Sequence, residues 1–130
     1  MYEKDTIVAL ATKAGDSAIN IIKLSGERAI EIADSIFRAE SNKKIKDINT
    51  YNITYGKVYD EKEEIIDEAI VSVMKGPKSY TREDVVEINC HGGIASVNKI
   101  MDVLLKNGAR IAEPGEFTKR AFLNGRIELS

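Results

Sequence analysis

Glu87 has the clearest potential for chemistry in this sequence, because it interrupts an apolar strand pattern. The stretch V-V-E-I-N-C-H-G-G runs from Val85 to Gly93. Side chains alternate along an extended backbone, so this strand has two distinct faces. One face is predicted to hold Val86, Ile88 and Cys90, and the other Val85, Glu87 and Asn89. A carboxylate among apolar neighbours is costly to bury unpaired, so we expect Glu87 to accept hydrogen bonds from the chain or from a ligand.

His91, Gly92 and Gly93 follow this strand and precede a helical pattern. Two interpretations of the glycines stay open: their backbone N–H groups bind an anion at a helix N-terminus, or they allow a tight turn with positive φ. His91 is the only histidine. Without an identifiable partner it is interpreted as a residue that caps or packs nearby, not as a base.

Lys23 and Arg126 are two further charged residues of interest. Lys23 shares a strand face with Ile19 and Ile21. Lysines are seldom buried, so we interpret Lys23 as an exposed residue near a strand end. Nothing in the periodicity predicts that Lys23, Glu87 and Arg126 converge.

Length and composition indicate one soluble globular domain. The 130 residues are 43% hydrophobic and 31% charged, which suits a single ordinary core. No apolar run is long enough to span a bilayer and Met1–Leu10 has no signal-peptide pattern, so we expect a cytoplasmic protein without membrane attachment. Cys90 is the only cysteine, which excludes an intrachain disulfide and a multi-cysteine zinc site.

Several function classes lack their sequence requirements. The net charge of −2 argues against a main task of gripping nucleic-acid phosphates. Lys43, Lys44 and Lys46 form a short basic run beside Asp47, which we interpret as a solvated loop. Neither G-x-x-x-x-G-K-S/T nor G-x-G-x-x-G after a strand is present, so the chain has no such motif for a nucleoside triphosphate or dinucleotide. No Ser-His-Asp arrangement can be identified.

Hydrophobic periodicity and turn residues predict an α+β domain, with a mixed sheet and helices packed on it. The predicted strands are Thr6–Thr12, Ala18–Leu24, Tyr51–Tyr59, Ile65–Met74, Val85–Cys90 and Arg110–Ala112. The predicted helices run from Ser25-Gly26 to Phe37, from Ile94 to Leu105 and from Glu116 to Leu123. Ala39–Asn49 is predicted to be a surface connection.

Local signals add detail to these elements. Ser25 is expected to cap the first helix, and Thr81 with Asp84 to cap a single helical turn. The tyrosines of Tyr51–Tyr59 are expected in the core or in an interface. The last helix is expected to face inward through Phe117, Ala121 and Phe122. The middle helix is expected to bury a stripe of Ile94, Val97, Ile100, Met101, Leu104 and Leu105.

Four colinear segments carry a resemblance to a known family. They are D-T-I-V-A-L-A-T at Asp5–Thr12, L-S-G at Leu24–Gly26, G-P-K-S-Y-T-R-E-D-V-V-E-I-N-C-H-G-G at Gly76–Gly93 and P-G-E-F-T-K-R-A-F-L-N-G-R at Pro114–Arg126. Together they closely resemble the N-terminal domain of the tRNA-modification GTPases called MnmE or TrmE. The resemblance covers essentially the whole chain.

The resemblance implies a mixed sheet with flanking helices, related to the folate-binding domain of aminomethyltransferases. It implies a domain that dimerises and is followed by a helical domain with an inserted GTPase, where GTP, Mg and K bind. It also implies an FAD-containing partner protein, with which the dimer adds an aminomethyl-type group to the wobble uridine of tRNA. The one-carbon source would be a tetrahydrofolate derivative.

The resemblance further implies a site for 5-formyltetrahydrofolate. The family binds it through a basic residue on the second strand, a glutamate before H-G-G and a basic residue after A-F-L-N, which match Lys23, Glu87 and Arg126. A pterin ring presents adjacent N–H and amino donors that a carboxylate accepts, while carbonyls and the glutamate tail favour cations. No catalytic residue and no metal ligand is expected in this chain.

Two departures from the family pattern are visible. Family members often have arginine at Lys23 and lysine at Arg126, so the charge is kept while the donor geometry differs. The early loop is often A-T-P-P-G-x-G-G in the family, whereas Ala11–Ala18 reads A-T-K-A-G-D-S-A.

We therefore expect residues 1–124 to form the folate-binding and dimerisation domain, and residues 125–130 to begin the helical domain. The alternative is a purely structural dimerisation module that has lost folate. A third reading, an enzyme acting alone on a folate, is disfavoured because the chain is short and offers no identifiable nucleophile or base.

Overall fold

The computed structural model describes residues 5–11 and 19–125. Within these residues, one mixed sheet has seven strands in the order β3-β4-β5-β6-β2-β1-β7. The strands are β1 Ile7–Leu10, β2 Asn20–Ser25, β3 Phe37–Ala39, β4 Ile53–Tyr59, β5 Ile65–Met74, β6 Val85–Cys90 and β7 Arg110–Ile111. All neighbouring strands run antiparallel except β1 and β7, which are parallel.

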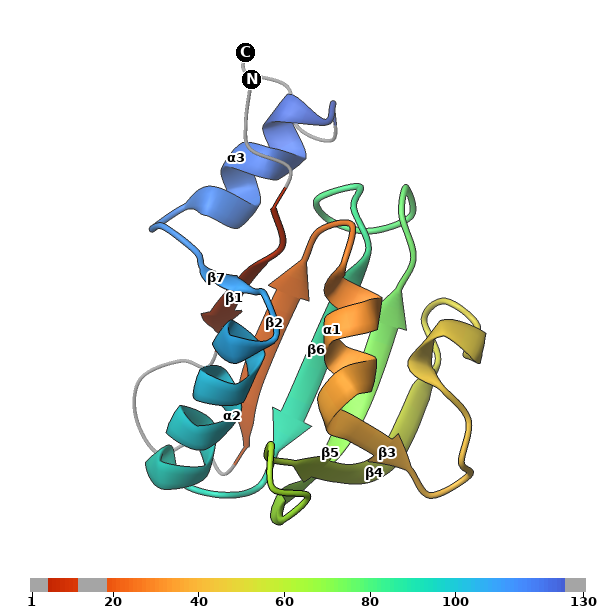
Figure 1. Ribbon diagram of the computed structural model, residues 1–130. Helices are drawn as coiled ribbons and strands as arrows, with labels where there is room; N and C mark the ends of the chain where they lie inside the picture. The colour runs from red at the N-terminus through yellow and green to blue at the C-terminus, as the bar shows by residue number, and fades with distance from the viewer. Residues whose placement is uncertain (1–4, 12–18, 126–130) are drawn as a thin grey trace.

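Three α-helices accompany the sheet in the described part of the chain: α1 Ala29–Ile36, α2 Ile94–Lys106 and α3 Glu116–Leu123. A short 3-10 helix, η1, spans Ile45–Asp47. Figure 1 shows α1 and α2 on the same face of the sheet, while α3 lies beyond one end of the strands. None of the described helices has the length and apolar character needed to cross a membrane.

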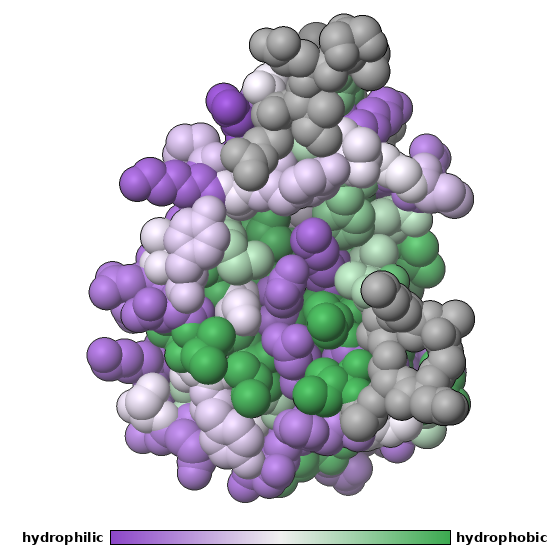
Figure 2. All heavy atoms as spheres, turned by 180° about the vertical axis from the view of Figure 1, so that it is seen from behind, coloured by the Kyte–Doolittle hydropathy of each residue, from purple (hydrophilic) through white to green (hydrophobic). Residues whose placement is uncertain are grey.

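The core lies between the sheet and the α1–α2 layer. Alternate residues of the central strands are fully buried there, among them Ile22, Leu24, Val71, Val86 and Ile88. The opposite face of the sheet carries none of the helices formed by the described residues. Figure 2 shows this helix-free face, where hydrophobic side chains gather on both sides of a hydrophilic band.

The α+β class is confirmed, and most predicted elements are found. The bounds of β5, β6 and α3 agree with the prediction, while β1 and β2 are shorter. Their connecting loop, residues 12–18, lies outside the described residues. The predicted surface connection contains η1 and the buried Ile45, because Asp34 accepts the backbone N–H of Ile45 at 2.7 Å and draws this loop against α1.

Both predicted caps are wrong. Ser25 ends β2, and its hydroxyl lies 2.7 Å from Thr81 Oγ1 and donates to Glu83 at 2.8 Å. Helix α1 begins after Arg28 without a side-chain cap. Thr81 caps no helical turn, because its side chain is buried against Ser25, and Asp84 instead accepts the Gly76 N–H at 2.9 Å.

The tyrosine face of β4 was predicted to be core or interface, and it is not core. Tyr51, Ile53 and Tyr55 are 62%, 66% and 40% exposed. The buried residues of β4 are instead Gly56 and Val58. A side chain at Gly56 would meet the Arg38 carbonyl at 2.2 Å, so only glycine lets β3 approach here.

Burial on the helices differs from the predicted stripes in two places. Ile94 is 67% exposed at the start of α2, and Val103 is buried in addition to the predicted residues. On α3, Ala121 is buried as predicted, but Phe122 is exposed. The largest buried side chain of α3 is Arg120, which no periodicity predicted.

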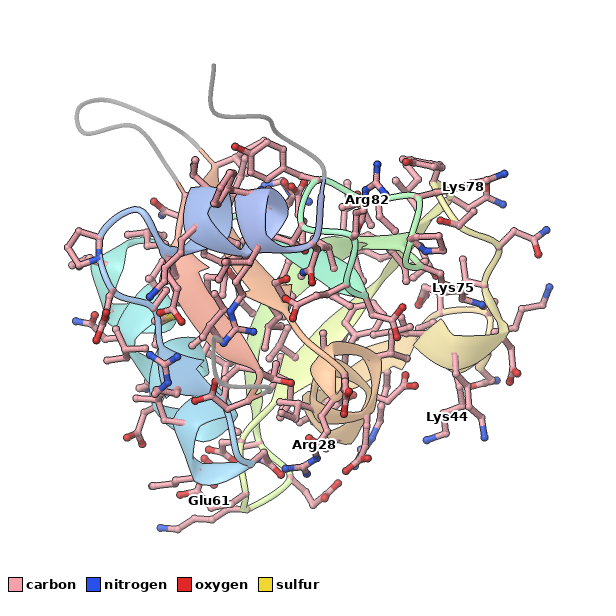
Figure 3. The ribbon with its side chains drawn as sticks, turned by 90° about the horizontal axis from the view of Figure 1, so that it is seen from above. Arg28, Lys44, Glu61, Lys75, Lys78 and Arg82 are labelled. Atoms are coloured by element: carbon pink, nitrogen blue, oxygen red, sulfur yellow. The ribbon has the colours of Figure 1, made fainter. Side chains whose placement is uncertain are left out.

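The basic run is solvated, as predicted. Lys43, Lys44 and Lys46 are all exposed. Figure 3 shows Lys44 and Lys78 pointing outward at the side of the molecule opposite α2. Lys75 on the same side instead donates to the Lys46 carbonyl at 2.8 Å.

Candidate functional site

Lys23 and Glu87 lie directly opposite each other on the adjacent strands β2 and β6. Both are partly buried, and both project from the helix-free face, because their neighbours Leu24 and Val86 are fully buried in the core. Side chains at directly opposed positions have Cβ atoms about 4.5–5.5 Å apart. The structure therefore brings together two of the three residues that the resemblance implied.

These two residues belong to a row that crosses five strands on this face. The pairings join Ala9 to Lys23, Lys23 to Glu87, Glu87 to Ser72, and Ser72 to Ile53. Within residues 5–11 and 19–125, no hydrogen bond or ion pair engages the Glu87 carboxylate. Its oxygens are thus available to donors of a ligand lying on the row.

Two aromatic rings surround the Lys23 ammonium group. Its Nζ lies 5.2 Å from the ring centroid of Phe117 and 5.5 Å from that of Tyr80. A cation within about 6 Å of a ring face is attracted by the ring quadrupole. The Tyr80 hydroxyl lies 3.2 Å from the Thr118 hydroxyl, which links the two aromatic segments.

Tyr80 and Phe117 were not predicted as site residues. Both lie in the segments that carried the resemblance, S-Y-T and E-F-T. Their convergence depends on the packing of α3 against the loop before β6, which periodicity does not encode. Only the presence of an aromatic residue in each segment was visible in the sequence.

Behind these rings lies a cluster of five charged residues, here called the Arg120 cluster: Asp5, Glu83, Arg110, Glu116 and Arg120. The Arg120 side chain is 0% exposed. It donates to the Asp5 carbonyl at 2.6 Å and to Asp5 Oδ1 at 2.8 Å. It also lies 3.3 Å from Glu83 and 3.3 Å from Glu116.

Arg110 completes the cluster from the more exposed side. It donates to Asp5 through Nε and to Glu116 at 2.6 Å. The hydrogen bond from Arg110 is the main reason that the pKa of Asp5 is lowered from 3.8 to about 2, with Arg120 adding to it and burial opposing it. Arg110 likewise lowers the pKa of Glu116.

The glycines after β6 fit neither of their two interpretations. Gly92 donates its N–H to Asp67 at 2.7 Å, so a carboxylate of the chain takes the place of an external anion. Neither Gly92 nor Gly93 has positive φ. A side chain at Gly92 would instead meet Ser96 Oγ at 2.3 Å, so the glycine permits a close approach to α2. His91 is exposed and does not pack as expected.

The third implied residue, Arg126, lies outside the described residues. In the sequence it directly follows Gly125. Asn124, just after the end of α3, is described and donates to the Thr81 carbonyl at 2.8 Å. No group of three or more potential metal ligands occurs among the residues the structure describes.

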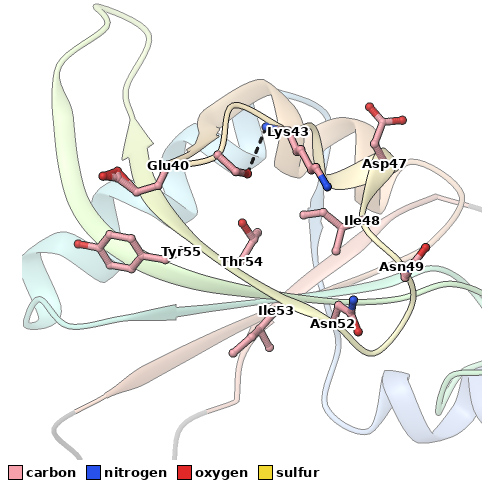
Figure 4. Close-up of a pocket in the computed structure, with 10 residues that line it drawn as sticks. Glu40, Lys43, Asp47, Ile48, Asn49, Asn52, Ile53, Thr54 and Tyr55 are labelled. Carbon is pink, nitrogen blue, oxygen red and sulfur yellow. Dashed lines mark hydrogen bonds between the residues drawn. The ribbon is translucent and has the colours of Figure 1, made fainter.

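A hollow lies elsewhere on the described surface, beside the outer edge of β4. It has a volume of about 410 Å³ and is lined by the connection from Glu40 to Asn49 and by Asn52–Tyr55. Figure 4 shows its charged residues, Glu40, Lys43 and Asp47, spread around the rim and not facing one another.

The chain is similar to known proteins over its whole length. Residues 6–126 match the family described as the GTP-binding protein TrmE N-terminus. The chain is 58% identical over 131 aligned residues to the tRNA modification GTPase MnmE of Geobacillus kaustophilus (strain HTA426), and 55% identical to that of Alkaliphilus oremlandii (strain OhILAs). Each alignment covers 100% of this chain and 28% of the relative. The chain thus spans little more than a quarter of these relatives, and it belongs to the family of TrmE N-terminal domains.

Proposed function

We propose that this chain binds a reduced folate, 5-formyltetrahydrofolate or a related tetrahydrofolate, on the Lys23–Glu87 row. The observation that carries the proposal is the direct cross-strand pairing of Lys23 with Glu87 on an open sheet face. A carboxylate accepts the adjacent N–H and amino donors of a pterin ring in bidentate fashion. Lys23 beside it supplies positive charge for carbonyls or for the carboxylates of the glutamate tail.

The aromatic rings of Tyr80 and Phe117 support the same ligand class. They stand at the Lys23 end of the row and offer flat apolar surface to a fused ring system. Arg126, which follows α3 in the chain, is proposed as a second cation for the folate tail. The chemistry of these groups suits a ligand with a polar heterocycle at one end and negative charge at the other.

Dimerisation through this domain is part of the proposal. The helix-free face exposes Ile53, the last residue of the row, and the nearby Tyr55, and a second copy that covers this face would enclose the site. Exposed apolar residues of this kind favour an interface between two copies.

The wider role is proposed from the relatives, which are named tRNA modification GTPases. We propose that this domain delivers the folate one-carbon unit within such a GTPase. With an FAD-containing partner, the whole protein would add an aminomethyl-type group to the wobble uridine of tRNA in the cytoplasm. GTP hydrolysis, with Mg and K, would belong to the GTPase domain that the relatives' names imply.

Calorimetry with 5-formyltetrahydrofolate tests the site. Glu87→Ala removes the acceptor of charge-assisted hydrogen bonds worth about 1.5–3 kcal/mol, so affinity should fall about 10- to 100-fold. Glu31→Ala is the matched control, because Glu31 is exposed on α1, on the opposite face of the sheet. Unchanged binding by Glu87→Ala would refute the assigned role of Glu87.

Light scattering during the same titration measures the oligomeric state, and it distinguishes the proposed function from the alternative of a purely structural module. A dimer that ignores folate would indicate a purely structural dimerisation module. A dimer that binds folate supports the proposal as stated.

A further inference from the structure

Arg120 joins three segments that are distant in the sequence. Its guanidinium group contacts Asp5 before β1, Glu83 in the loop before β6, and Glu116 on its own helix. The side chain is 0% exposed, although it carries a permanent charge. Buried charges of this kind persist only when they are paired and hydrogen-bonded, so the position of α3 is tied to these carboxylates.

Two of these three segments, α3 and the loop before β6, also carry an aromatic residue of the site. Phe117 precedes Arg120 by three residues on α3, and Tyr80 precedes Glu83 by three residues in the loop. The contact between Arg120 and Glu83 therefore fixes the distance between the two ring-bearing segments. The Lys23 ammonium group lies near both rings, 5.2 Å from the centroid of Phe117 and 5.5 Å from that of Tyr80.

We propose that Arg120 is a positioning residue of the Lys23 site. It holds α3 against the loop before β6, and this sets the two aromatic walls around the Lys23 ammonium group. The inference rests on the proposed function only in taking the ligand of this site to be a folate.

The donor geometry explains why this position uses arginine. Arg120 serves the carbonyl and carboxylate of Asp5 and reaches two further carboxylates, which requires donors spread over a planar fork. Lysine places three donors on one nitrogen and cannot span the same acceptors. Without Arg120, Asp5 and Glu116 would keep only their contacts with Arg110, and the link from α3 to Glu83 would be lost.

Nuclear magnetic resonance of lysine labelled with carbon-13 tests the inference in the unliganded protein. Two nearby ring faces should displace the ε-methylene resonance of Lys23 upfield of the other lysines. Arg120→Met should remove most of this displacement, as Phe117→Leu does directly. Arg28→Met is the control, because Arg28 forms an exposed ion pair with Glu31 and touches neither ring.

Two milder variants keep the test decisive where Arg120→Met fails to fold. Arg120→Lys keeps the charge, and Glu83→Gln keeps the shape of the partner while weakening the same contact. Either should reduce the upfield displacement in a protein that melts cooperatively. A Lys23 resonance that stays in place in folded Arg120→Lys and Glu83→Gln would overturn the positioning role.

A double-mutant cycle on folate affinity connects the inference to the ligand. Arg120→Lys should weaken binding several-fold in the parent chain, yet add little once Phe117→Leu has removed the wall that Arg120 positions. Equal losses in both backgrounds would contradict the inference. Absence of folate binding by the parent chain would overturn the proposed function alone, because the resonance of Lys23 is measured without ligand.

Discussion

The Lys23–Glu87 row and the hollow beside β4 differ in how the fold arranges their charged side chains. At the row, opposed strands align a cation with a carboxylate, and two rings frame the cation. The hollow has a volume of about 410 Å³, but its charged groups come from a connecting loop and do not converge. We therefore identify the candidate site by functional side chains that adjacent strands hold close together, and not by the presence of a hollow.

Two groups of charged residues also differ in how they are held. The Arg120 side chain is 0% exposed, whereas the Arg38–Glu63 ion pair, between β3 and the turn after β4, has side chains that are 56% and 67% exposed. Burial removes solvent screening, so the same kind of contact constrains the structure far more at the row. The predictions below set these two regions against each other.

The largest expected effect is on stability. Arg120→Met removes the fully buried partner of Asp5, Glu83 and Glu116, and breaking this buried network should lower the free energy of unfolding by about 3–5 kcal/mol. Arg38→Met, which loses an exposed ion pair and a stacking contact with Tyr59, should lower the stability far less, because solvent screens this pair. Urea unfolding followed by circular dichroism measures both. Similar losses for the two variants would remove the contrast between the regions.

The next effect is on ligand affinity. Lys23→Met removes the cation of the row and should weaken 5-formyltetrahydrofolate binding about 10-fold or more, as expected for a lost charge-assisted contact. Lys23→Arg should bind at least as well as the parent, because it restores the arginine common in the family. Asn52→Ala in the hollow should change affinity less than twofold. A larger loss of affinity in Asn52→Ala than in Lys23→Met would indicate that the ligand binds in the hollow.

The smallest effect is the acid sensitivity of the Arg120 cluster. The pKa of Asp5 is lowered to about 2 in the folded state, so protonation is harder there than in the unfolded chain. Stability from this group is present above about pH 4 and is lost as pH falls toward 2. Asp5→Asn should flatten the decline of unfolding free energy over this range, measured by urea titration at several pH values. An unaltered pH slope in Asp5→Asn would show that Asp5 is not held in this way.

The sequence predicted the elements well where local signals agreed with the tertiary structure. β5 and β6 were found at their predicted bounds, because apolar alternation is bounded by turn residues on both sides. The face of Glu87 followed from the same alternation. Its register against Lys23 did not follow, because alternation determines the face of a residue and not its partner on the next strand.

The predictions that were wrong concern residues whose environment depends on contacts between distant segments. Ser25 is an ordinary helix cap by its local sequence, but Thr81 and Glu83 engage its hydroxyl from 56 and 58 residues away. The periodicity of α3 did not predict that Arg120 is buried, because its carboxylate partners lie as far away in the sequence as Asp5. The tyrosine face of β4 alternates like a core strand, yet no helix covers that side of the sheet.

Amide chemical-shift mapping during titration with 5-formyltetrahydrofolate tests the central claim most directly. The account predicts that the largest changes occur at residues 22–24 and 86–88 and around Tyr80, with little change at 40–49 and 52–55. Changes concentrated at 40–49 and 52–55, or no saturable change at Lys23 and Glu87, would contradict it.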